Sequence, residues 1–307
     1  MKHFDLAVAW NWEFDADYIH GIQGECRQRN ISIYEIRPDH LQHVIGELRS
    51  GHLRFKSFYD RASDADEAFV PLVRLLADPA VRVINPHGLV AHAIDKATMH
   101  LEFITNGINV PPTIILSPYS RDRSLSVTDR DLEWLRRPFV IKPANTTGGG
   151  TGVVVNAMTL EDIIRSRQVH PNDKYLLQEF IHPKKLDGRR GWFRVYSVFN
   201  EIIICWWDDQ THEYSELSAA EEERFSVQGL RLIMRTIKQI TGLDFFSSEI
   251  ALAADGKFIV VDYVNEICDM RLKSKYQNGA PDDVVHRIER LIVAEISACV
   301  HQPQQVA

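Results

Sequence analysis

Apolar runs and amphipathic stretches alternate along the first third of the chain. Residues 4–10, "FDLAVAW", form a short apolar run typical of a buried strand, and "ISIYEI" at 31–36 forms a second one. Residues 15–29 between them read as a helix. Strand, helix and strand in this order predict a small α/β unit, which a helix at 64–77 and a strand at 81–85 continue.

A second pattern begins near residue 89. Residues 89–105 carry apolar side chains at helical spacing, and Gly107 supplies a C-terminal stop. "INVPPTIIL" then starts a strand with prolines at its edge, so a domain boundary is expected between about 86 and 115. The expected later strands are 138–142, 152–156, 175–181, 192–199, 201–206, 245–253 and 257–262, and the expected helices are 218–241 and 281–300.

Composition narrows the class of protein. A chain of 307 residues suggests about two domains. The net charge of −7 argues against a sequence-blind nucleic-acid binder, which usually needs a basic face. The four cysteines lie far apart without a CxxC pair, and no apolar run reaches the roughly 18 residues of a membrane span. The N-terminus also lacks the apolar core of a signal peptide, so we expect a cytoplasmic protein without membrane or nucleic-acid partners.

The stretch "VIKPANTTGGGTGVVV", residues 140–155, places a lysine on a strand beside a glycine-rich loop. No lysine follows the glycines as in a Walker P-loop, and the GxGxxG spacing of a Rossmann fingerprint is incomplete. Flexible glycines with nearby hydroxyls can still form an anion-binding concavity, here involving Gly148, Gly149, Gly150, Thr146 and Thr147. The favoured ligand is a nucleoside triphosphate contacted by Lys142; the alternative is a hairpin tip that binds nothing.

Two carboxylates are expected to face each other in "SSEIALAADGKFIVVDYVN", residues 247–265. Asp255-Gly256 between apolar runs is a strong hairpin signal, and a two-residue turn there pairs Ala254 with Lys257. The same register pairs Glu249 with Asp262. Two like charges directly opposite each other are destabilising, so the pairing is best explained by a cation that lies between the two carboxylates. Because the ligands would be oxygens, Mg²⁺ is the expected cation. The alternative is an exposed hairpin face with both acids solvated.

Five segments, in order, resemble the ATP-grasp superfamily, and most closely its glutathione-synthetase-like and ribosomal-protein glutamate-ligase-like amide ligases. They are "NPHGLVAHAIDKATMHLEFITNGINVPPTIIL", "FVIKPANTTGGGTGV", "LLQEFI", "FRVYSVFNEIIICWW" and "EIALAADGKFIVVDYVN". The resemblance covers roughly residues 80–272. It implies an α/β (α+β) ATP-grasp fold with an N-terminal Rossmann-like pre-ATP-grasp domain at 1–88. The ATP-grasp domain would span 89–307, with a central lid at about 113–182 and a C-terminal subdomain at about 183–307.

The resemblance also implies roles for single residues. Lys96 and Lys142 would reach the ATP phosphates, under a flap that contains Thr147, Gly148, Gly149 and Gly150. The hinge, Gln178, Glu179, Phe180 and Ile181, would hold adenine, with backbone groups of Glu179 and Ile181 at its edge. Arg194 and Arg271 would face the transferring phosphoryl group, and Glu249, Asp262 and Asn265 would hold one or two Mg²⁺ ions.

Three of these residues also have explanations that involve no functional role. Lys96 could be a solvated helix lysine, Arg194 could pair with an acid in a sheet, and Arg271 could be a surface charge. The sequence also departs from the family pattern. Two residues, rather than one, separate Asp262 from Asn265, so that a bulge is needed or Glu266 substitutes. Trp192 occupies a position where many relatives carry an acid.

The implied reaction joins a small carboxylate to an amine through an acyl phosphate, and releases ADP and phosphate. The alternatives are a small-molecule kinase on the same fold and an ATP-binding regulatory protein without turnover. Arg61 in "FYDRAS" is the candidate for binding a substrate carboxylate, against the alternative of a salt bridge at a surface turn. Fold analogy alone suggests a homodimer.

Overall fold

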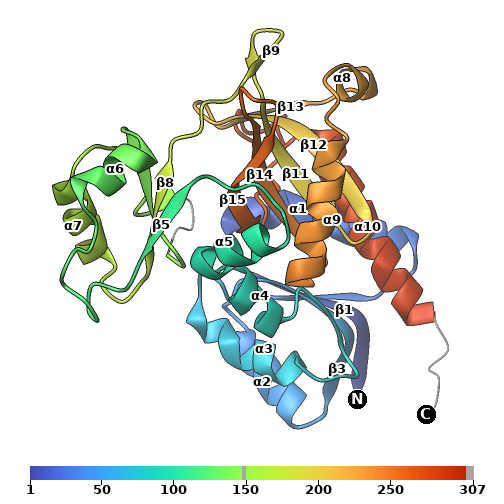
Figure 1. The fold of residues 1–307 in the computed structure, drawn as a ribbon. Helices are drawn as coiled ribbons and strands as arrows, with labels where there is room; N and C mark the ends of the chain where they lie inside the picture. Colours follow the sequence, from blue (N-terminus) through green and yellow to red (C-terminus); the bar gives the residue numbers. More distant parts are fainter. Residues whose placement is uncertain (147–149, 302–307) are drawn as a thin grey trace.

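The computed structural model describes residues 1–146 and 150–301. Within these ranges the strands form two four-stranded sheets, one five-stranded sheet and one two-stranded hairpin, with helices packed around them (Figure 1). The predicted mixed α/β architecture is therefore confirmed.

The N-terminal sheet is parallel, in the order β2-β1-β3-β4. Its elements are β1 (Lys2–Trp10), η1 (Glu13–Asp15), α1 (Ala16–Gln28), β2 (Ile33–Ile36), α2 (Leu41–Arg49), β3 (Leu53–Arg61), η2 (Glu67–Phe69), α3 (Val70–Leu76) and β4 (Arg82–Ile84). Leu6 and Val8 of β1 share a core with α1 and the last helix, α10 (Asp282–His301), whereas Ala7 and Ala9 share another with α2 and α3. Because helices cover both faces, β1 is a continuous apolar run.

The prediction for this region omitted α2 and β3. Strand β3 begins with alternating buried and exposed positions, and its exposed positions, Arg54 and Lys56, are charged. This pattern is weaker than the apolar run of β1, although β3 lies between β1 and β4 in the sheet. The expected strands at 4–10, 31–36 and 81–85 correspond to β1, β2 and β4.

Helix α1 packs against α10, and Gly21 makes this packing close. A Cβ atom on Gly21 would overlap the carboxylate of buried Glu289, whereas one on Gly24 of the same helix meets nothing within 4 Å. We expect Gly21→Ala to raise the free energy of unfolding by less than the roughly 0.5–1 kcal/mol of a full helix-propensity gain, because the Glu289 carboxylate at the end of a flexible side chain must move away. Gly24→Ala should raise it by about 0.5–1 kcal/mol through helix propensity. Urea unfolding of both variants tests this; equal effects would contradict it.

Burial raises the pKa of Glu289, Glu25 acts in the same direction, and a 3.0 Å hydrogen bond with His286 opposes the shift. The pKa of this carboxyl group is higher in the folded state than in the unfolded state. Its contribution to stability is therefore fully present below the unfolded pKa, and it is lost as the pH rises through the folded pKa. Glu289→Gln should therefore gain stability relative to the wild-type protein as the pH rises above 4.5, the ordinary value. Urea unfolding at about pH 4.5 and about pH 8 measures the difference; a constant difference would argue against this assignment.

The helix expected at 89–105 is two helices, α4 (His87–Ala93) and α5 (Lys96–Thr105). Asp95 causes the break, because it adopts an extended conformation and its side chain accepts hydrogen bonds from the backbone N–H groups of Ala97 and Thr98. This N-cap starts α5 and makes Lys96 its first residue.

The second four-stranded sheet is antiparallel, in the order β5-β8-β6-β7, and stands apart from the rest of the protein in Figure 1. Its elements are β5 (Thr113–Leu116), α6 (Asp129–Leu135), β6 (Phe139–Pro143), β7 (Val154–Ala157), α7 (Leu160–Val169) and β8 (Tyr175–Glu179). Thr128 and Thr159 begin α6 and α7 with capping boxes. The sheet lies within the range expected for the lid, 113–182, and the domain limits themselves stay a prediction.

The five-stranded sheet is antiparallel, in the order β13-β12-β11-β14-β15. Its strands are β11 (Trp192–Val198), β12 (Glu201–Asp208), β13 (Glu213–Glu216), β14 (Phe245–Leu252) and β15 (Phe258–Asn265), preceded by the hairpin β9 (Lys185–Leu186) and β10 (Arg189–Arg190). The helix expected at 218–241 is divided into α8 (Ala219–Arg224) and α9 (Gly229–Thr241), with Ser226 at φ 52° between them. The sheet carries the side chains of the candidate site.

Candidate active site

The β14–β15 hairpin pairs Glu249 with Asp262, as predicted. The predicted turn is wrong, however. Ala253 donates to the carbonyl of Lys257 at 2.8 Å, and Gly256 has φ 86°, so the turn contains one more residue than expected. A register shift between Glu249 and Ile250 compensates for the longer turn and restores the opposed carboxylates.

A second register shift follows between Glu249 and Ser247, and it places Asn265 opposite Ser247. A bulge of this kind is one of the two expected ways to accommodate the two residues between Asp262 and Asn265, the other being substitution by Glu266. Asn265 thus ends β15 on the strand that carries Asp262. Its participation in metal binding stays a prediction.

Arg194 on β11 lies directly across from Glu249, which itself lies across from Asp262. The guanidinium of Arg194 donates to Glu249 Oε1 at 2.5 Å. A cation and two carboxylates therefore form one row across three neighbouring strands. Arg194 does pair with an acid of its sheet, and that acid is the expected metal ligand.

Two lysines reach the same row from other elements. Lys142 on β6 donates to the carbonyl of Val261 at 3.0 Å, beside Asp262. Lys96, at the start of α5, lies 3.9 Å from Asp262 Oδ1. Three predicted cations, from α5, β6 and β11, thus surround the two predicted carboxylates.

The charges of this cluster stabilise one another. Burial opposes ionisation of Asp262, but Lys96, Lys142 and Arg194 hold its pKa below the usual value. Burial lowers the pKa of Lys142, and Lys96 adds to this shift, while Asp262 and Glu249 oppose it. Buried charges of one sign are costly unless partners balance them. If a metal ion neutralised Glu249 and Asp262, Lys96 and Lys142 would be able to bind an anionic ligand.

Trp192 departs from the pattern expected at its position, and its indole donates to Glu249 Oε2 at 3.2 Å. Both oxygens of Glu249 thus accept a hydrogen bond on the β11 side. The guanidinium of Arg194 also lies over the Trp207 ring, 4.8 Å from its centroid. These contacts hold Glu249 and Arg194 in fixed orientations.

Lys96 is held in place through the second four-stranded sheet, β5-β8-β6-β7. Its backbone N–H donates to the carbonyl of Ala144, just after β6, at 3.1 Å. Lys174, just before β8, forms an ion pair with Asp95, the N-cap of α5. The first turn of α5 is therefore attached at two points to the sheet that carries Lys142.

Thr147, Gly148 and Gly149 of the predicted flap lie outside the described residues. Gly150, at φ 80°, and Gly152, at φ 73°, have the left-handed backbone expected of glycine. The chain entering the loop is held by Asp173, which accepts hydrogen bonds of 2.9–3.1 Å from the backbone and side chains of Asn145 and Thr146. Sequence reasoning missed Asp173, since 27 residues separate it from Thr146.

The hinge residues have varied surroundings. The Gln178 side chain is buried and donates at 2.7 Å to the hydroxyl of Tyr263, which is also 2.6 Å from His100 Nδ1. The Glu179 carboxylate pairs with Arg136 at 2.7 Å. The backbone N–H of Glu179 donates to the carbonyl of Pro112 at 2.9 Å, and adenine binding by these four residues stays a prediction. The Phe180 ring packs against His182, and Ile181 is buried.

Arg271 lies among aromatic rings. Its guanidinium forms a bidentate pair with Asp269 and lies 5.5 Å from the centroids of Trp12 and Tyr276. The partly buried side chain is no plain surface charge, and its expected contact with a phosphate stays a prediction. Glu266, the alternative ligand, follows Asn265, and burial raises its pKa to about 7.

Arg61 differs from both expectations. The side chain is fully buried and donates to the Asp15 carboxylate through Nε at 2.8 Å and Nη2 at 2.7 Å. The same guanidinium donates to the Tyr59 hydroxyl and to the carbonyl of Cys268. Arg61 is therefore neither exposed to a substrate nor in a surface salt bridge; β3 directs it into the interior, where Asp15 neutralises it.

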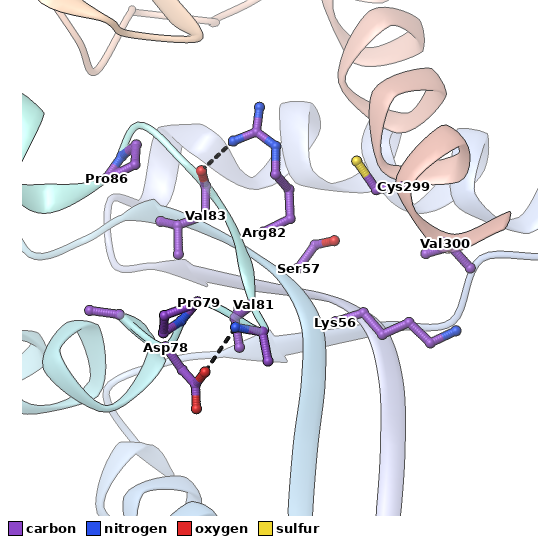
Figure 2. A pocket seen from close by; sticks show the side chains of 12 residues that line it. Lys56, Ser57, Asp78, Pro79, Val81, Arg82, Val83, Pro86, Cys299 and Val300 are labelled. Atoms are coloured by element: carbon purple, nitrogen blue, oxygen red, sulfur yellow. Dashed lines mark hydrogen bonds between the residues drawn. The ribbon is translucent and has the colours of Figure 1, made fainter. Parts of the chain in front are cut away.

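Two hollows lie away from the carboxylate pair. Figure 2 shows one of about 840 Å³ at the edge of the N-terminal sheet, between β3, β4 and the end of α10. A second, of about 570 Å³, is lined by the β9–β10 hairpin, Trp207 and Tyr214. Trp207, which lines this second hollow, also packs against Arg194.

Two searches of the described residues gave negative results. No group of three or more His, Cys, Asp or Glu side chains within 1–146 and 150–301 is arranged to hold a metal ion. The predicted set needs only two carboxylates and an amide. In the same ranges, no helix has the length and apolar character needed to cross a membrane.

Comparison with solved structures identifies the fold. A RimK-domain ATP-grasp protein from Sphaerobacter thermophilus has a TM-score of 0.62 at 17% identity, over 94% of this chain and 98% of its own. The macrocyclase MdnC from Microcystis aeruginosa, bound to its precursor peptide, gives 0.65 at 13%, over 95% and 100%. A D-alanine–D-alanine ligase from Bacillus anthracis, in complex with ATP, gives 0.64 at 14%, over 98% of each chain.

No protein-family model matches the sequence, and no curated protein is significantly similar to it. The structural similarity extends over nearly the whole chain and shows that the protein has the ATP-grasp fold. The expectation drawn from the five sequence segments is confirmed for the fold.

Proposed function

We propose that this protein is an ATP- and Mg²⁺-dependent carboxylate–amine ligase that forms an amide or peptide bond and releases ADP and phosphate. The carrying observation is the row Arg194–Glu249–Asp262 across three strands, with Lys96 and Lys142 beside it. Opposed carboxylates surrounded by three cations suit the joint binding of a metal and a polyphosphate.

The residues present fit a magnesium site. Mg²⁺ prefers oxygen ligands and is usually bound through one or two carboxylates together with substrate phosphates, rather than by a complete protein cage. Glu249 and Asp262 supply two carboxylates, and Asn265 ends the same strand. When bound, the metal would neutralise charge on the transferring phosphoryl group.

The proposed reaction has two steps. A substrate carboxylate oxygen attacks the γ-phosphorus of ATP, ADP leaves, and an acyl phosphate forms. The amine nitrogen then attacks the acyl carbon, phosphate leaves, and the nitrogen loses a proton. Lys96, Lys142 and Arg194 would stabilise the negative charge in both steps, so no nucleophilic side chain is required.

The structural neighbours support this class of reaction without establishing it. Beside the D-alanine–D-alanine ligase, they include the ATP-grasp ligase PsnB, solved with a minimal precursor, Mg and ADP. We infer that this chain shares the ADP-forming chemistry, with backbone groups of Glu179 and Ile181 at the adenine. The acid and the amine are small molecules or peptide ends whose identity the test below would reveal.

Hydroxylamine offers a direct test, because it traps acyl phosphates as hydroxamates. Purified protein would be incubated with Mg-ATP, hydroxylamine and a panel of amino acids, dipeptides and small diacids. We expect hydroxamate and ADP to appear together with one acid. ADP together with a product heavier by one phosphate would instead indicate a kinase, and ATP binding without turnover of any acid would contradict the ligase.

A further inference from the structure

The buried guanidinium of Arg61 connects the N-terminal sheet to the chain that follows β15. Arg61 ends β3, and its Nη2 donates to the carbonyl of Cys268 at 3.0 Å. The thiol of Cys268 in turn donates to the carbonyl of Asn265 at 3.3 Å. Two hydrogen bonds thus lead from Arg61 to the last residue of the strand that carries Asp262.

Asp15 holds Arg61 in the orientation that this contact needs. The pair is bidentate, and both side chains are almost completely buried. Tyr18 and Tyr59 enclose the guanidinium, with its carbon 5.0 Å and 5.9 Å from their ring centroids. A bidentate Arg–carboxylate pair adds geometric specificity as well as energy, so the donor that faces Cys268 has one allowed direction.

Further contacts join the same two segments. Arg271 lies over the rings of Trp12 and Phe14, and Lys275 forms a 2.6 Å ion pair with Asp17. Residues 12–17, which follow β1, therefore contact residues 271–275, beside the contact between Arg61 and Cys268. Among these contacts, the one made by Arg61 is buried and lies nearest in sequence to Asn265 and Glu266.

We propose that Arg61 is a positioning residue of the active site: held by Asp15, it fixes the Cys268 carbonyl and thereby the placement of Asn265 and Glu266 beside Asp262. This inference rests on the proposed function, because it assigns Arg61 a role in organising the predicted metal site. Groups that orient metal ligands typically change metal affinity or activity by about 10–100-fold when they are lost.

The test compares Arg61→Lys and Asp15→Asn with a matched control. Lysine keeps the positive charge but lacks the planar guanidinium, which donates to Asp15 and to the Cys268 carbonyl at the same time. The control is Arg82→Lys, since Arg82 also forms a bidentate pair, with Asp244 at 2.8 and 2.9 Å, between the N-terminal sheet and the residue before β14. That pair involves neither Cys268 nor Asn265.

Two readouts separate positioning from general stability. Binding of Mn²⁺ in the presence of ADP, followed by electron paramagnetic resonance, should weaken about 10-fold in Arg61→Lys and Asp15→Asn. The kcat for ADP release should fall about 10-fold, with KM for ATP changed less than about twofold. Arg82→Lys should leave both near the wild-type values.

The inference would be overturned if Arg61→Lys and Arg82→Lys had the same Mn²⁺ affinity and the same kcat. Failure of the proposed function is distinguishable, since it would show as wild-type protein that releases no ADP with any acid. The Mn²⁺ comparison would still decide the role of Arg61 in that case. Wild-type protein that binds no Mn²⁺ would overturn the inference together with the metal site.

Discussion

Asp262→Asn is expected to reduce ADP release at least about 100-fold, the loss typical of removing one group that stabilises transition-state charge. The substitution keeps the size of the side chain but removes a negative charge that faces Lys96 and Lys142. Lys142→Met should have an effect of similar size, because it removes a cation from the same row. Steady-state ADP release with the acid identified by the hydroxamate test measures both.

The matched control lies on the same hairpin. Asp255 is an exposed turn residue whose carboxylate accepts a hydrogen bond from the backbone of Lys257, and asparagine can replace this acceptor. Asp255→Asn should therefore retain wild-type turnover. Near-normal ADP release by folded Asp262→Asn protein would remove the metal hairpin from the mechanism.

Asp15→Ala is expected to lower the free energy of unfolding by about 3–5 kcal/mol, the range for breaking a buried ion pair on one side. The substitution leaves the fully buried charge of Arg61 without its bidentate partner. Urea or thermal unfolding measures the loss. For comparison, an exposed pair such as Arg165–Glu161 on α7 should contribute less than about 1 kcal/mol.

The double variant Asp15→Ala/Arg61→Met gives the second arm of this test. Replacing a whole buried ion pair with apolar side chains is often neutral or stabilising, because no uncompensated charge remains. We therefore expect the double variant to be more stable than Asp15→Ala alone. Additive losses from the two single substitutions would show that Arg61 and Asp15 do not act as a unit.

The candidate site depends on contacts between the second four-stranded sheet, β5-β8-β6-β7, and the five-stranded sheet. Lys142 lies on β6 of the four-stranded sheet, yet it donates to the backbone of β15. Gln178 on β8 similarly donates to Tyr263, the residue after Asp262. The predicted phosphate-binding Lys142 and the predicted metal hairpin are thus linked by hydrogen bonds that cross between the two sheets.

Local chemistry made several features predictable. The continuous apolar run of β1, the lysine beside the glycines and the opposed acids of the hairpin each follow from neighbouring residues in the sequence. The pairing of the two acids was predicted correctly, but the turn from which it was predicted is not the one that forms. The expected two-residue turn does not form, and the register shift beside Glu249 restores the pair.

Helix limits were less predictable, because single residues override the apolar spacing. Asp95 ends one helical run and caps the next, and Ser226 in the left-handed region separates α8 from α9. Apolar spacing was an imperfect guide on both sides of these breaks, since Leu89, Leu101 and Ile104 are exposed and α8 has no buried residue. The first break places Lys96 at the start of a helix beside Asp262.

The sequence by itself determined the ATP-grasp fold class, through five segments that resemble this superfamily, and the carboxylate pair, because Glu249 and Asp262 lie in one hairpin. Only the tertiary structure decided the fate of Arg61 and the roles of Asp173 and Trp192. Their partners are Asp15, Thr146 and Glu249, which lie 27 to 57 residues away. Whether an arginine binds a substrate or a buried aspartate depends on which side chains folding brings to it, and local patterns carry no record of that.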